Sequence, residues 1–211
     1  DAQESRGLGD VYKRQDYEIQ FGNVKRPTHK NTSWDRARFE VCAHKWADLS
    51  EPGYGVALMN DCKYGYDVHE GVMGLTLIKS GIFPNPDADQ GQHEFTYALF
   101  PHQGDFRKGS VVREAYDLNC PMAWEKVQGI YEDSFSMLQI AEENVMADTV
   151  KAAEDGNGII VRIYETWGMR TKVHVNFPLA PDAQVTVCDC MENFSGVENC
   201  LLYTSPSPRD S

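Results

Sequence analysis

A polar turn after an apolar stretch carries the side chains best suited to contact a sugar. The segment NDCKYGYD supplies an amide at Asn60, a carboxylate at Asp61, an ammonium group at Lys63 and a phenol ring at Tyr64. Sugar C–H faces pack on aromatic rings, whereas sugar hydroxyls need directional hydrogen-bond partners. This combination predicts a surface close to a carbohydrate.

A second segment, AHKWADLSE, has a similar composition, with His44 and Trp46 at alternating positions near a strand end. We count both residues among the carbohydrate-proximal candidates. A structural interpretation of the two segments stays open, and we favour it over direct sugar contact. In it the amide and carboxylate cap a turn, the lysine is solvated, and Tyr64 and Trp46 are core aromatic residues.

We expect no catalytic residue, metal ligand or cofactor in this chain. Asp87, Asp89, His93 and Glu94 have the composition of a metal site. The two aspartates, however, lie in a glycine-containing loop, and the other two residues point to opposite faces of a strand. Phosphate-binding glycine loops, nucleophile elbows and zinc-protease helices are missing from the sequence.

Short β-type segments separated by Gly, Pro, Asn and Asp predict an all-β chain with at most short helices. The expected strands are Tyr17 to Val24, Ala37 to Trp46, Gly55 to Met59, Gly71 to Ile78, Gln92 to Phe100, Ile159 to Thr166, Lys172 to Phe177 and Ala183 to Cys188.

Three segments do not fit this series of strands. The turn sequence Asp155-Gly156-Asn157-Gly158 favours a hairpin between Val145 to Glu154 and Ile159 to Thr166, although Met146, Val150 and Ala153 also fit helical spacing. Lys108 to Asn119 predicts a short helix. Ser80 to Gln92, with two prolines and two glycines, predicts a long loop.

The bulk properties exclude some partners. A net charge of -12 and the lack of a Lys/Arg run argue against nucleic acid. No apolar stretch approaches membrane-spanning length, so no membrane partner is expected. Apart from Cys200, which lies in the adapter-like end described below, the cysteines are scattered and indicate reduced thiols rather than disulfides; they are Cys42, Cys62, Cys120, Cys188 and Cys190.

The two ends of the chain are encodable by the two strands of one short DNA segment. Ser5 to Gln15 and Cys200 to Asp210 have this relation, and the DNA is similar to a sequencing adapter. We therefore expect residues 1–15 and 200–211 to be adapter-derived, disordered tails. Residues 16–199 are expected to form a β-sandwich region truncated at both ends.

Four ordered blocks of sequence resemble the α-mannosidases of glycoside hydrolase family 38, most of all the cytosolic and bacterial members. They are FEVCAHKWADLSEPGYGVALMNDCKYGYDVHEG from Phe39, ADQGQHEFTYALFPHQGDF from Ala88, NVMADTVKAAEDGNGIIVRIYETWG from Asn144, and CDCMEN from Cys188. Together the blocks extend over nearly all of residues 16–199.

The resemblance implies a galactose-mutarotase-like β-sandwich (supersandwich) that is incomplete in this chain. In enzymes of the family, this sandwich follows a catalytic domain. The family hydrolyses terminal α-mannosyl units with retention, using an aspartate nucleophile and a divalent metal, usually zinc, in that other domain. A retaining glycosidase needs two carboxyl groups roughly 5 Å apart across the sugar. No such pair is recognisable here, so we expect the chain alone to be inactive.

The resemblance also suggests partners and a location. We expect the parent's own catalytic domain and a mannose-containing oligosaccharide as partners, with the NDCKYG turn near the edge of the catalytic cleft and the protein in the cytoplasm. A stand-alone carbohydrate-binding sandwich using Trp46 and Tyr64 is the alternative. A domain for packing and homo-oligomer contact is a third interpretation, which predicts an exposed apolar patch.

Overall fold

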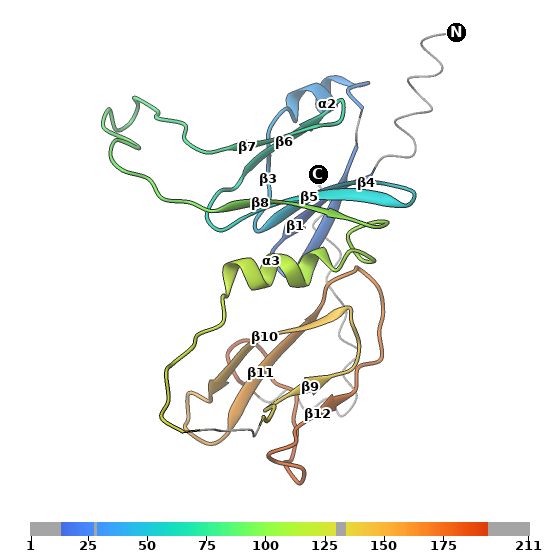
Figure 1. Ribbon diagram of the computed structural model, residues 1–211, viewed down its shortest axis with the longest axis vertical. Helices are drawn as coiled ribbons and strands as arrows, with labels where there is room; N and C mark the ends of the chain where they lie inside the picture. The colour runs from blue at the N-terminus through green and yellow to red at the C-terminus, as the bar shows by residue number, and fades with distance from the viewer. Residues whose placement is uncertain (1–13, 28, 130–133, 194–211) are drawn as a thin grey trace. The chain divides into compact units, whose positions relative to one another are not determined.

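The computed structural model describes residues 14–27, 29–129 and 134–193 (Figure 1). The chain divides into two compact units, and the boundary along the chain lies between Trp124 and Glu125. The boundary between the units falls inside the region 16–199, which the sequence analysis treats as one. The all-β prediction is confirmed, because strands dominate and only two short helices occur among the described residues.

A five-stranded antiparallel sheet in the order β2-β1-β4-β5-β8 forms the larger layer of the first unit. Its strands are β1 (Arg14–Ile19), β2 (Gly22–Arg26), β4 (Trp46–Glu51), β5 (Tyr54–Asn60) and β8 (Tyr97–His102).

A three-stranded sheet in the order β3-β6-β7 forms the second layer. Its strands are β3 (Val41–Cys42), β6 (Gly65–His69) and β7 (Val72–Thr76). Tyr17, Ala47 and Leu58 of the larger sheet share one buried cluster with Tyr66 and Val68 of the smaller one. Alternation along each strand places these side chains on one face, so the two sheets form a β-sandwich.

The other face of the larger sheet packs on α3 (Val111–Asn119). Val111, Val112 and Ala115 are the buried residues of this helix. Trp46 of β4 stacks on Phe106, with ring centroids 5.1 Å apart. The short helix predicted within Lys108 to Asn119 is therefore confirmed, and its apolar stripe anchors it on the sheet.

A second, one-turn helix, α2 (Ser33–Ala37), lies on the surface and has no buried residue. Thr32 begins it through a capping box, in which the threonine hydroxyl accepts from the Asp35 backbone N–H and the Asp35 carboxylate accepts from the Thr32 N–H. Local hydrogen bonds rather than burial thus determine where this helix starts.

The described residues of the second unit form two separate two-stranded antiparallel sheets. One pairs β9 (Gln139–Ile140) with β12 (Val175–Asn176), and the other pairs β10 (Val145–Ala152) with β11 (Ile159–Glu165). Gly156 and Gly158 adopt positive φ angles in the turn between β10 and β11. The hairpin prediction is therefore confirmed and the helical alternative is wrong, because cross-strand pairing overrides the helical spacing.

Some predicted strands have different bounds. Tyr17 to Val24 is a hairpin of β1 and β2, because Phe21 turns the chain with a φ of 54°. Ala37 to Trp46 contains the end of α2, the two-residue β3 and the start of β4. The strand predicted from Gln92 begins only at Tyr97. In each case the backbone hydrogen-bond partner, not the local composition, sets the end of the strand.

Near the end of the described chain, the strand predicted at Ala183 to Cys188 does not form; only an isolated bridge occurs, at Cys188. The strand predicted at Lys172 to Phe177 shrinks to the two residues of β12. Ser80 to Gln92 contains no helix or strand, as predicted. Strand propensity without an adjacent strand to pair with does not produce a ladder.

The first boundary also differs from the expectation. Arg14 and Gln15 belong to β1 rather than to a tail, and the Gln15 side-chain amide donates to the Val68 carbonyl at 3.0 Å. The remainder of the two predicted tails, residues 1–13 and 200–211, lies outside the described residues. For those residues the adapter interpretation stays a prediction.

Candidate functional site

The candidate turn is organised by Asn60, the last residue of β5, whose side chain is 1% exposed. Its amide oxygen accepts hydrogen bonds from the backbone N–H groups of Cys62 at 3.0 Å and Lys63 at 2.5 Å. An Asn side chain that accepts from the next residues closes an Asx-type turn. Asn60 therefore shapes the turn rather than offering its carbonyl oxygen to a ligand.

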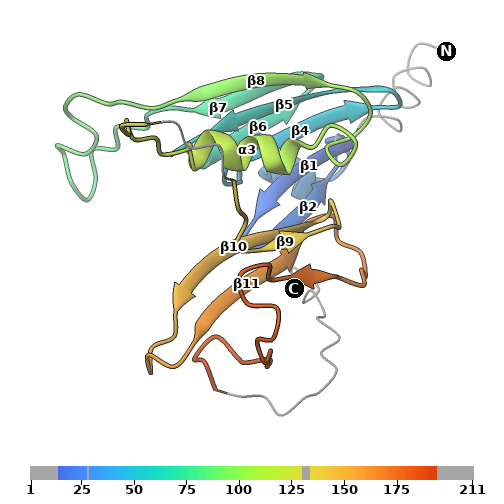
Figure 2. The ribbon, with the colours of Figure 1, turned by 60° about the horizontal axis from the view of Figure 1, so that its bottom comes forward.

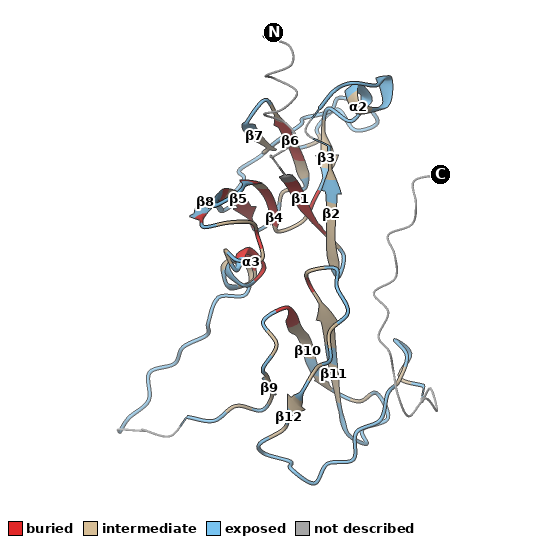
Figure 3. Cartoon of the chain, turned by 90° about the vertical axis from the view of Figure 1, so that its right-hand side faces the viewer, coloured by how far each residue is buried: buried red, intermediate tan, exposed pale blue. Residues whose placement is uncertain are grey.

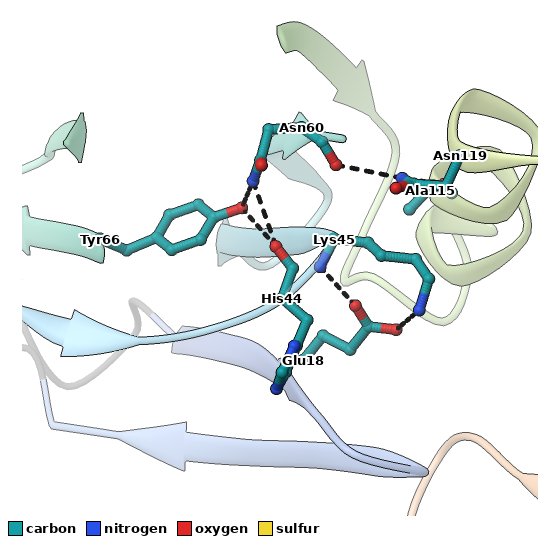
Figure 4. Close-up of polar contacts among 7 residues, drawn as sticks. All are labelled: Glu18, His44, Lys45, Asn60, Tyr66, Ala115 and Asn119. Carbon is teal, nitrogen blue, oxygen red and sulfur yellow. Dashed lines mark hydrogen bonds and ion pairs between the residues drawn. The ribbon is translucent and has the colours of Figure 1, made fainter. Parts of the chain in front are cut away.

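The amide nitrogen of Asn60 connects this turn to neighbouring strands (Figure 4). It donates to the His44 carbonyl at 3.1 Å and to the Tyr66 hydroxyl, which in turn donates to the same carbonyl at 3.0 Å. Burial raises the pKa of Tyr66, so this hydroxyl stays protonated. The side-chain hydrogen-bonding groups of Asn60 are thus engaged inside the protein.

Glu18 and Lys45 extend the same network. The Glu18 carboxylate, 5% exposed, accepts from the Lys45 backbone N–H at 2.6 Å and from its ammonium group at 3.3 Å. Burial raises the pKa of Glu18, although the lysine partly offsets the effect. The ammonium group also lies 4.5 Å from the centre of the Tyr116 ring on α3.

Asn119 joins the end of α3 to the turn. Its side-chain amide donates to the Asn60 carbonyl at 3.0 Å and to the Ala115 carbonyl at 2.8 Å. These contacts tie a helix end to the end of β5, so the network acts as a structural clamp. The sequence analysis missed Glu18, Tyr66 and Asn119, because isolated polar residues in a strand or helix give no distinctive pattern.

Three of the candidates reach the surface. The Asp61 carboxylate accepts from the Thr96 backbone N–H at 3.0 Å, and this hydrogen bond lowers the pKa of Asp61. The Lys63 ammonium group lies 4.9 Å from the Phe95 ring centre. Tyr64 is 55% exposed and meets the His44 ring edge-on, with centroids 5.5 Å apart.

Trp46 is the candidate least able to meet a sugar, because it is only 1% exposed and its ring stacks on Phe106. The structural interpretation is thus right for Trp46 and for the turn-forming Asn60. It is wrong for Tyr64, which lies at the surface. Proximity of the turn to a carbohydrate stays a prediction.

A buried acidic group lies elsewhere in the larger sheet. Asp16 and Asp48 are directly opposed in β1 and β4, and each is 1% exposed. The Asp48 carboxylate pairs with the His102 ring at 2.8 Å, whereas the Asp16 carboxylate oxygens have no hydrogen-bond partner among the described residues. Burial raises the pKa of Asp16 to about 6. At this depth the two carboxyl groups cannot flank a sugar.

The described residues contain no group of three or more His, Cys, Asp or Glu side chains that could hold a metal ion. In the Ser80 to Gln92 loop, Asp89 accepts from the Ser80 N–H at 2.9 Å through its carboxylate, and its backbone carbonyl contacts the His93 ring at 2.7 Å. These residues stabilise the loop itself. The residues present therefore do not fit the zinc site that the family resemblance implies for the parent enzyme.

A small cavity in the first unit, lined in part by Arg26, Asp35, Arg38 and Asp67, has a volume of about 20 Å³. This is room for about one water molecule, so it does not accommodate a hexose. No helix in the described part of the chain is long and apolar enough to cross a membrane.

The fold and the polar network define a class: a β-sandwich region whose polar side chains mainly hold strands and a helix together. The family comparisons agree. Residues 12–87 match the glycosyl hydrolases family 38 C-terminal domain, and residues 144–202 match the family 38 C-terminal beta sandwich domain. The chain belongs to glycoside hydrolase family 38, and it corresponds to the C-terminal part of proteins of that family.

Curated relatives include alpha-mannosidase G of Dictyostelium discoideum, 43% identical over 188 residues, and human alpha-mannosidase 2C1, 44% identical over 180 residues. These alignments cover 84% and 83% of this chain but only 17% of each relative. The crystal structure of an alpha-mannosidase from Enterococcus faecalis V583 superposes with a TM-score of 0.67 at 20% identity, covering 83% of this chain and 21% of that one.

Proposed function

We propose that this chain is a non-catalytic C-terminal β-sandwich part of a retaining α-mannosidase that hydrolyses terminal α-mannosyl residues of glycans. The burial of the opposed carboxyl groups Asp16 and Asp48 carries the proposal. A retaining glycosidase needs two carboxyl groups at the surface of a cleft, roughly 5 Å apart across the glycosidic bond. The mannosidase relatives support the identity of the parent reaction.

In this proposal the chemistry belongs to polypeptide outside this chain. That part supplies the nucleophilic aspartate, the acid and the divalent metal, which we take to be zinc. This chain supplies a rigid support for the catalytic domain, and its turn at Asp61, Lys63 and Tyr64 lies near the cleft that receives a mannose-containing oligosaccharide. The clamp at Asn60 keeps that turn in a fixed conformation.

A chimera tests the proposal. The matched region of the human relative is replaced by the corresponding part of this chain, and hydrolysis of an aryl α-mannoside is measured for the chimera, for the relative with that region deleted, and for this chain alone. We expect activity in the chimera only. Hydrolysis by this chain alone that Asp16→Asn or Asp48→Asn abolishes would overturn its non-catalytic role.

A carbohydrate-binding module is the second candidate, and the exposed ring of Tyr64, which meets the His44 ring, favours it. Calorimetric titration of this chain with mannose distinguishes the two functions. Saturable binding that Tyr64→Ala abolishes and Tyr54→Ala retains would place the binding module first. Tyr54 is a suitable control because it is 52% exposed at the opposite end of β5.

We propose a cytoplasmic location as well. Its support is that the cysteines of the described chain are free and four of them are exposed, namely Cys42, Cys62, Cys120 and Cys190. Exposed thiols persist in reducing compartments. Fractionation of source cells with an antibody against this chain tests the location, and recovery in a secreted fraction would contradict it.

A further inference from the structure

The core of the first unit ends abruptly between β5 and β8. Leu58 of β5 belongs to the buried cluster and is 6% exposed, whereas Leu99, its direct cross-strand neighbour on β8, is 66% exposed. Tyr97, two residues away on the same face, is 58% exposed. The face that continues the core is therefore uncovered over β8.

β7 is an edge strand of the smaller sheet, since it pairs only with β6; β3 is the edge strand on the other side of β6. The hairpin between them has a two-residue turn, Glu70 and Gly71, both with positive φ, closed by the pair His69 and Val72. In such a hairpin the closing pair is hydrogen-bonded, so the alternate residues Met73 and Leu75 direct their backbone N–H and C=O groups away from β6. Both side chains pack against the core.

β7 lies on the β8 side of the smaller sheet. Figure 3 shows β7 and β8 at the same, left-hand end of the two layers, and in Figure 2 β7 likewise runs close to β8 in projection. A strand added beyond β7 would therefore lie over β8 and cover the face formed by Tyr97 and Leu99. Those two side chains and the free edge of β7 point to the same missing element.

The edge of β8 is a poorer place for an added strand. The Asp61 N–H donates to the Thr96 carbonyl, so Thr96 faces β5 and the alternate residues Tyr97, Leu99 and Pro101 direct their backbone outward. Pro101 has no N–H to donate there, and a proline on an edge strand blocks a continuous ladder. The geometry thus favours β7 over β8 as the edge with which an added strand would pair.

We propose that a strand from the part of the mannosidase polypeptide outside this chain pairs with β7 and covers Tyr97 and Leu99. This inference rests on the proposed function. The matched relatives contain about six times the length of this chain's alignment, since 17% of each is covered, so they have ample polypeptide to supply it. The occupant is an extended segment with alternating apolar residues, whose apolar side chains face Tyr97 and Leu99.

The test compares Leu99→Lys in this chain with Leu99→Lys in the chimera. We expect little change in the thermal midpoint of the isolated chain, because the side chain is already exposed, and a decrease of about 5 °C or more in the chimera. Val72→Lys is the matched control, since Val72 lies on β7 next to Met73 but is 68% exposed on the opposite face. It should change neither protein.

Hydrogen exchange provides a second measurement independent of activity. The amides of Met73 and Leu75 should exchange at least about 100-fold more slowly in the chimera than in the isolated chain, because they gain hydrogen-bond partners. An active chimera in which Leu99→Lys is harmless and these amides exchange unchanged would overturn the strand proposal alone. An inactive, folded chimera would count against the proposed function instead.

A second copy of this chain is the competing occupant. Sedimentation of the isolated chain measures it directly. A dimer that Leu99→Lys converts to a monomer, together with protected Met73 and Leu75 amides in that dimer, would assign the surface to self-association and overturn our proposal.

Discussion

The two units of this chain bury their apolar side chains to very different extents. The buried hydrophobic residues of the described chain lie in the first unit, with the single exception of Val145 at the start of β10. Figure 3 shows this contrast: buried colour concentrates in β1, β4, β5, β6 and α3, whereas β9 to β12 are mostly half-buried or exposed.

The contrast shows that strands need packing partners on their faces to bury apolar side chains. The first unit has two sheets and a helix that share cores on both faces of β4 and β5. The second unit has two-stranded sheets, and a single hairpin is at best marginally stable without further packing. We therefore expect the first unit to carry most of the cooperative stability, and the following variants test that expectation in order of decreasing effect.

Trp46→Ala should have the largest effect. It removes a fully buried ring from the stack on Phe106, and truncations of this kind cost about 3–5 kcal/mol. Chemical denaturation measures the free energy of unfolding. Trp124→Ala, at an 89% exposed position, is the control and should cost less than about 0.5 kcal/mol. Equal losses would show that the core assignment is wrong.

Asp16→Asn should stabilise the first unit at neutral pH. Burial raises the pKa of Asp16 from 3.8 to about 6, so the folded state holds its proton more tightly than the unfolded state. The protonated carboxyl contributes its full stability below about pH 4, and this stability is lost as the pH rises through about 6.

Each pKa unit corresponds to about 1.4 kcal/mol, so the gain at pH 7 approaches 3 kcal/mol. Denaturation midpoints of the wild type and Asp16→Asn between pH 4 and pH 7 measure it. Asp61→Asn is the control of opposite sign, because a hydrogen bond lowers the pKa of Asp61. A constant difference between wild type and Asp16→Asn across this range would contradict the assignment.

Asn60→Ala should have a smaller effect, about 1–3 kcal/mol, because it leaves the backbone N–H groups of Cys62 and Lys63 without their acceptor. Denaturation measures the loss, and exchange of those two amides should accelerate. Lys63→Ala keeps the turn hydrogen bonds and is the control. Unchanged amide exchange in Asn60→Ala would mean that the side chain does not organise the turn.

Lys151→Ala in the second unit should have the smallest effect. Its ammonium group pairs with Glu154 at 2.6 Å and Glu192 at 2.7 Å at the protein surface, where ion pairs contribute little and are screened by salt. The thermal midpoint should change barely measurably, and less still at high salt. A large, salt-independent loss would show that these contacts matter more to the second unit than its sparse core suggests.

Local patterns were sufficient for several elements. The Asp-Gly-Asn-Gly turn located the β10–β11 hairpin, and apolar spacing located α3. They failed at Phe21, because the turn between β1 and β2 falls on Gln20 and Phe21, one residue before the Gly22-Asn23 pair that would signal it. They also failed at Ala183 to Cys188, whose strand-like residues lack a partner to form a ladder.

The candidate site divides in the same way. Residue types identified Asn60, Asp61, Lys63 and Tyr64 as neighbours in one turn, because sequence proximity guarantees spatial proximity there. No local pattern brings Glu18 to Lys45, or Asn119 to Asn60, since these contacts depend on which strands and helix lie side by side.

Residue order alone was enough to establish an all-β, family 38 C-terminal region, since alternation, turn chemistry and ordered sequence blocks are all local or linear properties. Burial was not readable in that way. Packing placed Trp46 in the core, left Tyr64 at the surface and set Asp16 opposite Asp48, because the exposure of a side chain depends on what the rest of the chain stacks against it.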